Sequence, residues 1–199
     1  MESVVKGIKA FDKEITFQSL NEFIEGIDID TLEYGKHIIE PEALGDYGRN
    51  ELAMEPFECV LVCWPPKTES AIHLHDGLFG YVWVVEGELD NVFYRDNDGQ
   101  LIEFSIEKYC RNGLVPEPDG VIHKLRNNHV NQRAVSVHFY YPALTSFDGM
   151  KIYNPETGDT GILSDQAKSA FWNEEPGHFK SIERNVFEFV SYEKLNSEV

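Results

Sequence analysis

The chain has 199 residues, with 35 Asp and Glu against 17 Lys and Arg, so its formal net charge is -18. So acidic a protein repels phosphate backbones and anionic lipid, which argues against nucleic-acid binding and membrane attachment and for a small-molecule substrate. The length and the hydrophobic content of 42% indicate one globular domain over residues 1–199, and the oligomeric state stays open, with a monomer favoured.

The N-terminal residues lack the apolar run of a signal peptide, and no stretch reaches the ~18 apolar residues of a membrane span. We therefore expect a cytoplasmic protein. From Ser19 to about Leu44, apolar residues recur at spacings of three and four, and Ser19 with Glu22 resembles a capping box. These patterns predict one or two short amphipathic helices in an N-terminal segment at about 17–45.

Strand-forming runs separated by turn residues follow this segment. Short strands spaced by about 8–12 residues are typical of a β-sandwich or barrel rather than a parallel α/β sheet, and we expect the barrel over about 50–145. Cys59 and Cys63 share the first run at roughly 13 Å, too far apart to bind one metal, so we expect buried, reduced thiols. The expected strands are 57–64, 70–76, 79–86, 89–95, 101–107, 121–126 and 133–141.

The strand pattern weakens after Pro142, which leaves residues 146–199 as a C-terminal extension of undecided role. Asp165 could cap a short helix at 165–173. The last 25 residues could add an edge strand or wrap around the barrel, and the sequence leaves both alternatives open.

Two histidines, His73 and His75, stand on an expected strand with one residue between them. Alternate strand residues point to the same face, which puts their Cα atoms roughly 7 Å apart with both imidazoles on one side. Such a pair can bind iron, copper, nickel or zinc, and a metal site with open positions needs a third protein ligand. A surface strand can also carry two histidines by chance, so the spacing alone leaves both interpretations open.

His123 stands out among the other histidines because of its context. Residues 118–127 are PDGVIHKLRN. This stretch resembles the second sequence motif of the cupin superfamily, in which a proline, one residue, a glycine and two residues precede the metal histidine, and an asparagine follows after three more. The leading glycine of that motif would fall at Asn112, whereas this sequence has Gly113 one place later.

The first cupin motif is matched in part, by His73, His75 and the later Gly87. In most cupins a glutamate ligand stands at the position of Gly80, and here it is absent. The superfamily resemblance implies a mainly β fold, a cupin β-barrel with short N-terminal helices. It also implies a metal site of His73, His75 and His123 without a carboxylate ligand.

A three-histidine cupin site is typical of the thiol dioxygenases, and from about Tyr47 to Gly158 the chain resembles cysteine dioxygenase. Trp64, otherwise expected to be a packing residue, stands in a Cys-Trp pair nine residues before the first metal histidine, as in that family. The segments 47–50 and 136–142 resemble its tyrosine-x-arginine-asparagine and serine-x-histidine-x-tyrosine segments. Departures are Leu74, where an aspartate is common, and Tyr141, in place of a small residue.

This resemblance implies an Fe(II) enzyme that oxidises L-cysteine with O2 to cysteine sulfinic acid. It assigns the substrate carboxylate to Arg49, with Tyr47, and a relay beside the metal to Ser136, His138 and Tyr140. Without the match, Arg49 would be interpreted as a surface charge and His138 as a hydrogen-bonded core histidine. Gly80 falls where animal enzymes carry the cysteine that crosslinks to the tyrosine, which implies a bacterial-type enzyme with an uncrosslinked Tyr140.

Three alternatives remain. The substrate could be 3-mercaptopropionate or another small mercapto acid, although family members acting on 3-mercaptopropionate typically carry glutamine in place of Arg49. The chain could instead be a metal-binding cupin without oxygenase activity, acting as a sensor or scaffold. It could also be a cupin isomerase with a different metal.

Overall fold

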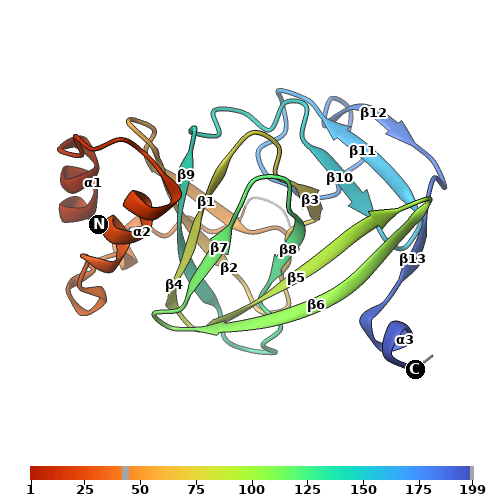
Figure 1. Cartoon of the computed structure of the whole chain (residues 1–199), viewed down its shortest axis with the longest axis horizontal. Helices are drawn as coiled ribbons and strands as arrows, with labels where there is room; N and C mark the ends of the chain where they lie inside the picture. Colours follow the sequence, from red (N-terminus) through yellow and green to blue (C-terminus); the bar gives the residue numbers. More distant parts are fainter. Residues whose placement is uncertain (42–44, 198–199) are drawn as a thin grey trace.

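The computed structural model describes residues 1–41 and 45–197, and it contains two β-sheets that curl around a common interior (Figure 1). The strands are β1 (Gly48–Ala53), β2 (Glu58–Trp64), β3 (Ile72–Leu74), β4 (Phe79–Glu86), β5 (Glu88–Asn97), β6 (Gln100–Cys110), β7 (Leu114–Glu117), β8 (Ile122–Arg126), β9 (Ala134–Tyr141), β10 (Lys151–Asn154), β11 (Asp159–Leu163), β12 (Phe179–Glu183) and β13 (Glu188–Val190). In the described part of the chain, one sheet has the order β1-β2-β9-β4-β7 and the other β12-β11-β10-β3-β8-β5-β6-β13. The expectation of a mainly β barrel with short N-terminal helices is confirmed.

The central strands of the first sheet are buried on both faces. Inward residues such as Val62 and Val82 pack in the barrel interior, while outward residues such as Leu61 and Phe139 pack against the N-terminal helices. Double burial explains why these strands are nearly continuous apolar runs rather than alternating ones. The interior face is therefore the only face of these strands that can line a site inside the barrel.

The N-terminal helices cover the outer face of this sheet (Figure 1). They are α1 (Glu2–Lys9), which the sequence analysis missed, and α2 (Phe17–Glu25). The capping box forms between Thr16 and Ser19 and not between Ser19 and Glu22, because the apolar face of α2 already begins at Phe17, which packs on Tyr81. The 3-10 turns Ile29–Thr31 and Gly35–His37 follow. The expected helical segment also included residues 42–44, which lie outside the described residues.

The C-terminal extension adds strands to the second sheet. Strands β10, β11 and β12 continue the sheet from β3, and β13 pairs in parallel with the opposite edge strand, β6, before α3 (Tyr192–Ser197). Of the two alternatives for the last residues, the added edge strand is therefore observed.

The helix expected at 165–173 does not form. The backbone N–H of Ala170 donates to Tyr47 Oη at 2.9 Å, and the Ala170 carbonyl accepts from the Ala71 N–H at 2.7 Å. Because these backbone groups bond to distant parts of the chain, they are not available for helical hydrogen bonds, and the segment crosses the barrel mouth as irregular chain.

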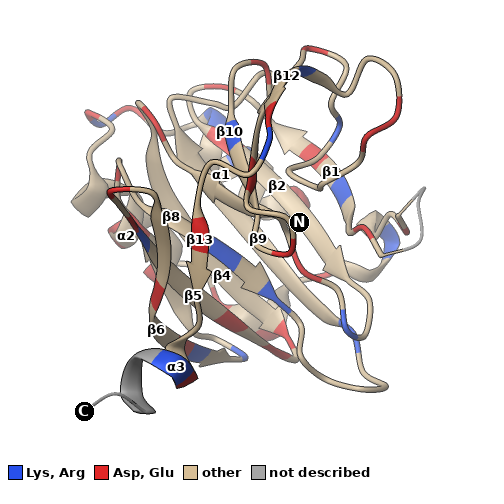
Figure 2. Ribbon diagram, turned by 90° about the vertical axis from the view of Figure 1, so that its right-hand side faces the viewer, with Lys and Arg blue, Asp and Glu red and all other residues tan. Residues whose placement is uncertain are grey.

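Acidic and basic residues are interspersed along the strands and loops in the view of Figure 2. In the described residues, no helix is long and apolar enough to cross a membrane.

Candidate metal centre

Three histidines converge inside the barrel. His73 on β3 and His123 on β8 are direct cross-strand partners, and His75 follows the end of β3. The Nε2 atom of His75 lies 3.0 Å from that of His73 and 3.2 Å from that of His123. All three side chains are buried, and their ligand atoms lie within 4.8 Å of one another. The predicted grouping of these residues is thus present.

The hydrogen bonds behind the rings direct the lone pairs inward. His73 Nδ1–H donates to the Ala71 carbonyl at 2.9 Å, and His123 Nδ1 contacts the Asn91 side-chain oxygen at 2.8 Å. Both contacts keep the proton on Nδ1 and leave Nε2 free to bind a metal. Burial lowers the pKa of His73 to about 4 and holds the pKa values of His75 and His123 well below the usual value, so the imidazoles are neutral.

This arrangement fits a transition-metal ion. The Nε2 lone pairs of His73 and His123 both face the Nε2 atom of His75. Because that atom can carry at most one proton, at least one of these two short contacts is not a hydrogen bond. A cation between the rings would remove that repulsion. Neutral imidazole is a ligand for iron, copper, nickel and zinc, so the donor set alone does not select among these metals.

Metal binding is expected to stabilise the fold measurably. A metal ion at about 100 times its Kd adds about 2.7 kcal/mol, which for a chain of this size raises the Tm by about 5–10 °C. Differential scanning calorimetry of the metal-free protein, with and without added Fe(II) under argon, checks this. The His73→Ala variant should show no comparable rise, and an equal rise in that variant would mean that the metal stabilises the protein from another site.

A chain of hydrogen bonds runs along one face of β9 toward the histidines. Trp64 Nε1–H donates to Ser136 Oγ at 2.9 Å, Ser136 Oγ lies 2.8 Å from His138 Nε2, and His138 Nδ1 lies 3.0 Å from Tyr140 Oη. The Tyr140 hydroxyl gives its one hydrogen to Glu117, so it accepts from His138 Nδ1–H. His138 Nε2 then carries no proton and accepts from the hydroxyl of Ser136. Burial, followed by the charge of Arg49, lowers the pKa of His138 to about 3, so this histidine is neutral.

The hydroxyl of Tyr140 donates in turn to Glu117, a residue that the sequence analysis did not select. Tyr140 Oη lies 2.6 Å from Glu117 Oε2, and the Glu117 side chain is almost completely buried. Its carboxylate oxygens lie 3.7 Å from His75 Nε2 and 3.7 Å from His123 Nε2. Burial raises the pKa of Glu117 to about 8. The structure therefore adds a carboxyl group to a site that was expected to have none.

Gly80 explains why no carboxylate comes from β4. It lies opposite Tyr140 of β9 and opposite Glu117 of β7. A Cβ atom at position 80 would clash with the Phe139 carbonyl oxygen and the Tyr140 ring. Tyr140 in its observed position therefore requires glycine at 80.

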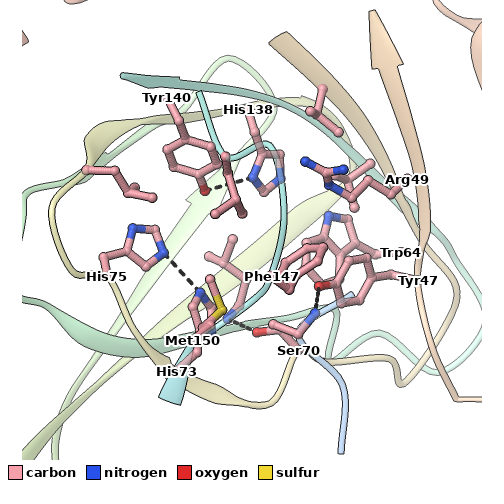
Figure 3. Close-up of a pocket in the computed structure, with 16 residues that line it drawn as sticks. Tyr47, Arg49, Trp64, Ser70, His73, His75, His138, Tyr140, Phe147 and Met150 are labelled. Carbon is pink, nitrogen blue, oxygen red and sulfur yellow. Dashed lines mark hydrogen bonds between the residues drawn. The ribbon is translucent and has the colours of Figure 1, made fainter. Parts of the chain in front are cut away.

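A pocket joins the histidines to Arg49, with His75 and Tyr140 at one end and Arg49, Trp64 and Tyr47 at the other (Figure 3). The C-terminal extension closes part of it with apolar side chains. The lining residues include Tyr47, Arg49, Trp64, Ser70, His73, His75, Leu78, Leu125, His138, Tyr140, Leu144, Phe147, Met150 and Ala170.

Arg49 lies in the pocket but is already engaged in ion pairs. Its guanidinium donates to Glu51 and to Glu58, and it lies 5.3 Å from the centre of the Phe147 ring. Glu58 is fully buried, and its second oxygen accepts from the Leu144 N–H at 2.7 Å. These contacts hold the guanidinium in place and offset part of its charge.

Tyr47 is fixed by its neighbours. Its ring packs on Trp64 with the centroids 4.6 Å apart, and its hydroxyl oxygen accepts from Ala170 N–H. The phenol keeps its own hydrogen for donation. Tyr47, Arg49, His73 and His75 thus line one pocket together with His138 and Tyr140. His123 lies behind it in contact with His75, and Ser136 lies behind it in contact with His138.

The fold and this centre define a metal-binding cupin, which is a mainly β barrel with three histidines in its interior. They are His73 on β3, His75 just after β3 and His123 on β8. The family model for cysteine dioxygenase type I matches residues 11–153. The chain belongs to that family, and membership together with the three-histidine centre supports a thiol dioxygenase acting on a small molecule and O2.

Three solved structures share part of the fold. A cupin domain of Cnp3 from Schizosaccharomyces pombe is 12% identical over 47% of this chain and 63% of that chain, with a TM-score of 0.39. The TT1209 protein of Thermus thermophilus is 15% identical over 56% and 96% of the two chains, with a TM-score of 0.44. A double-stranded β-helix protein from Klebsiella pneumoniae is 16% identical over 58% and 88%, with a TM-score of 0.41. These similarities are distant, so the functional assignment depends on the family match.

Proposed function

We propose that the protein is an Fe(II)-dependent dioxygenase that oxidises L-cysteine with O2 to cysteine sulfinic acid. The observation that carries the proposal is a pocket with His73 and His75 of the buried three-histidine group at one end and a fixed guanidinium at the other. The reaction adds both atoms of O2 to the thiol sulfur and needs no other reductant. The free thiols of Cys59, Cys63 and Cys110 are consistent with a reducing compartment, and we place the protein in the cytoplasm.

His73, His75 and His123 would hold the iron. When bound, Fe(II) would supply the redox chemistry toward O2 and favour the thiolate form of the substrate. The protein does not need a strong general base for this thiol, which suits a wall of neutral histidines.

The other residues of the pocket orient the substrate. Arg49 would receive the substrate carboxylate on the N–H groups that its glutamate partners leave free, with Tyr47 donating its hydroxyl beside it. This contact would fix the distance from carboxylate to sulfur and so the position of the sulfur near the histidines. The Leu144 and Phe147 side chains would exclude water from the bound substrate.

The relay would orient one hydroxyl group. Ser136 and His138 hold Tyr140 Oη as an acceptor on one side, so its O–H points away from β9 toward the centre. Because that one hydrogen is donated to Glu117, Tyr140 would fix the position of the carboxyl group beside the histidines.

A comparison of three thiols tests the substrate. Oxygen uptake by the iron-loaded protein should give the highest kcat/KM with L-cysteine, a lower value with 3-mercaptopropionate, and a value for cysteamine reduced by about 10–100-fold, since a hydrogen bond between charged groups contributes about 1.5–3 kcal/mol. Equal or greater turnover of another thiol would contradict the assignment to cysteine. No oxygen uptake with any thiol would contradict the dioxygenase itself.

A further inference from the structure

We propose that Glu117 is a fourth protein ligand of the metal, supplied by β7 from the position opposite Gly80. The inference rests on the metal centre of the proposed function but is independent of its substrate and of oxygenase activity. It would leave the substrate and O2 fewer positions on the metal than three histidines alone would.

The first support is the position of the carboxylate. Glu117 Oε1 lies 3.7 Å from His123 Nε2, and Oε2 lies 3.7 Å from His75 Nε2. Two nitrogen or oxygen ligands bound to one ion at about 2.1 Å lie at most about 4.2 Å apart. The carboxylate is therefore close enough to both histidines to share their metal.

The second support is an oxygen without a partner. Among the described residues, Glu117 Oε1 is inaccessible to solvent and accepts no hydrogen bond. A buried polar atom left in this state is costly. His123 Nε2, 3.7 Å away, is itself an acceptor because its ring donates through Nδ1 to Asn91. A cation bound to both atoms would satisfy them together.

The third support is the hydrogen bond on the other oxygen. Tyr140 donates to Glu117 Oε2 at 2.6 Å, which holds the carboxylate plane and leaves Oε1 directed at the site. Metal-binding carboxylates are commonly oriented by an outer hydrogen bond of this kind.

The register of the first sheet explains why the ligand comes from β7. Glu117 is the direct cross-strand partner of Gly80, so the two residues share one face of the sheet. Position 80 cannot carry a side chain because the Tyr140 ring and the Phe139 carbonyl occupy that space. The carboxylate on the next strand reaches the same side of the histidines.

Metal titration of the full chain tests this proposal without thiol or O2. Isothermal titration calorimetry of the metal-free protein with Fe(II) under argon, and with Co(II) in air, should show that Glu117→Gln raises the metal Kd by about 100-fold or more, since loss of even an outer partner costs roughly 10–100-fold. Gln keeps the shape of the side chain and an oxygen that can accept from Tyr140, so the fold should be retained.

Tyr140→Phe is the matched control because it removes the hydrogen bond and keeps the carboxylate. The fold-increase in its metal Kd over the wild-type value should be at least ten times smaller than the fold-increase for Glu117→Gln. Equal losses in the two variants would mean that Glu117 only positions Tyr140, and an unchanged Kd in Glu117→Gln would also overturn the proposal.

A crystal structure of the metal-loaded wild-type protein gives the same answer without a substitution. An oxygen of Glu117 at about 2.0–2.2 Å from the ion supports the proposal, and a separation beyond about 3 Å overturns it. In either case the thiol assay is a separate measurement, so a protein with four ligands and no oxygenase activity would contradict only the proposed function.

Discussion

Replacing His123 with alanine is expected to abolish stoichiometric metal binding and all thiol-dependent oxygen uptake. The side chain is completely buried, and its Nε2 is one of three converging nitrogen atoms. The two remaining histidines, His73 and His75, are separated by one residue at the end of β3 and cannot provide a ligand from the β8 side. The loss of metal affinity should exceed the roughly 10–100-fold that the loss of an outer partner costs. Metal analysis and an oxygen electrode measure both effects.

Two variants make this result interpretable. Asn91→Ala removes the acceptor of His123 Nδ1 and should weaken metal binding by about 10–100-fold without abolishing it. His129→Ala removes a histidine whose ring lies at a turn and accepts from the backbone N–H groups of residues 131 and 132, so metal content should stay at the wild-type level. Wild-type metal content in His123→Ala would show that the ion binds elsewhere.

Arg49→Ala is expected to lower the stability of the fold as well as weaken substrate binding. Glu58 is fully buried and bonded to Arg49, and loss of one partner of a buried ion pair costs about 3–5 kcal/mol because the other charge is left uncompensated. Urea denaturation measures this loss. KM for L-cysteine should rise about 10–100-fold in the same variant, since a hydrogen bond between charged groups contributes about 1.5–3 kcal/mol.

The double variant Arg49→Ala with Glu58→Gln separates the two effects. It removes both charges, so most of the lost stability should return while KM stays raised. Recovery of the wild-type KM in the double variant would mean that Arg49 acts only as the partner of Glu58 and does not bind substrate.

The stability loss in Arg49→Ala should also depend on pH. Burial raises the pKa of Glu58 even with Arg49 beside it, and removal of Arg49 should raise it further. A carboxyl group whose pKa is higher in the folded than in the unfolded state costs stability as the pH rises through that range, because the folded state must give up a proton that it binds more tightly. The destabilisation should therefore ease as the pH falls.

Local sequence patterns were sufficient to predict the three histidines of the metal centre and the strand face beside them. His73 and His75 follow from strand alternation, His123 from the motif around it, and the face of Ser136 and His138 from a period of two. The apolar runs of β2, β4 and β9 predicted strands at these positions, and burial on both faces explains why their signal is strong.

The features that were missed depend on contacts between distant segments. Glu117 lies between two prolines, outside the expected strands, and its role depends on the register with Gly80, which no local pattern encodes. The engagement of Arg49 by Glu58 likewise depends on the pairing of β1 with β2. The segment at 165–173 has helix-like composition, but Ala170 bonds to Tyr47 and Ala71 instead.

The most direct test of the proposed activity is the fate of labelled oxygen. The iron-loaded protein is supplied with L-cysteine under ¹⁸O2, and the product is analysed by mass spectrometry alongside the amount of oxygen consumed. We expect one O2 to be consumed for each cysteine and both labelled atoms to appear in cysteine sulfinic acid. Cystine with hydrogen peroxide as the products, or no cysteine-dependent oxygen uptake by a protein with a full complement of iron, would contradict it.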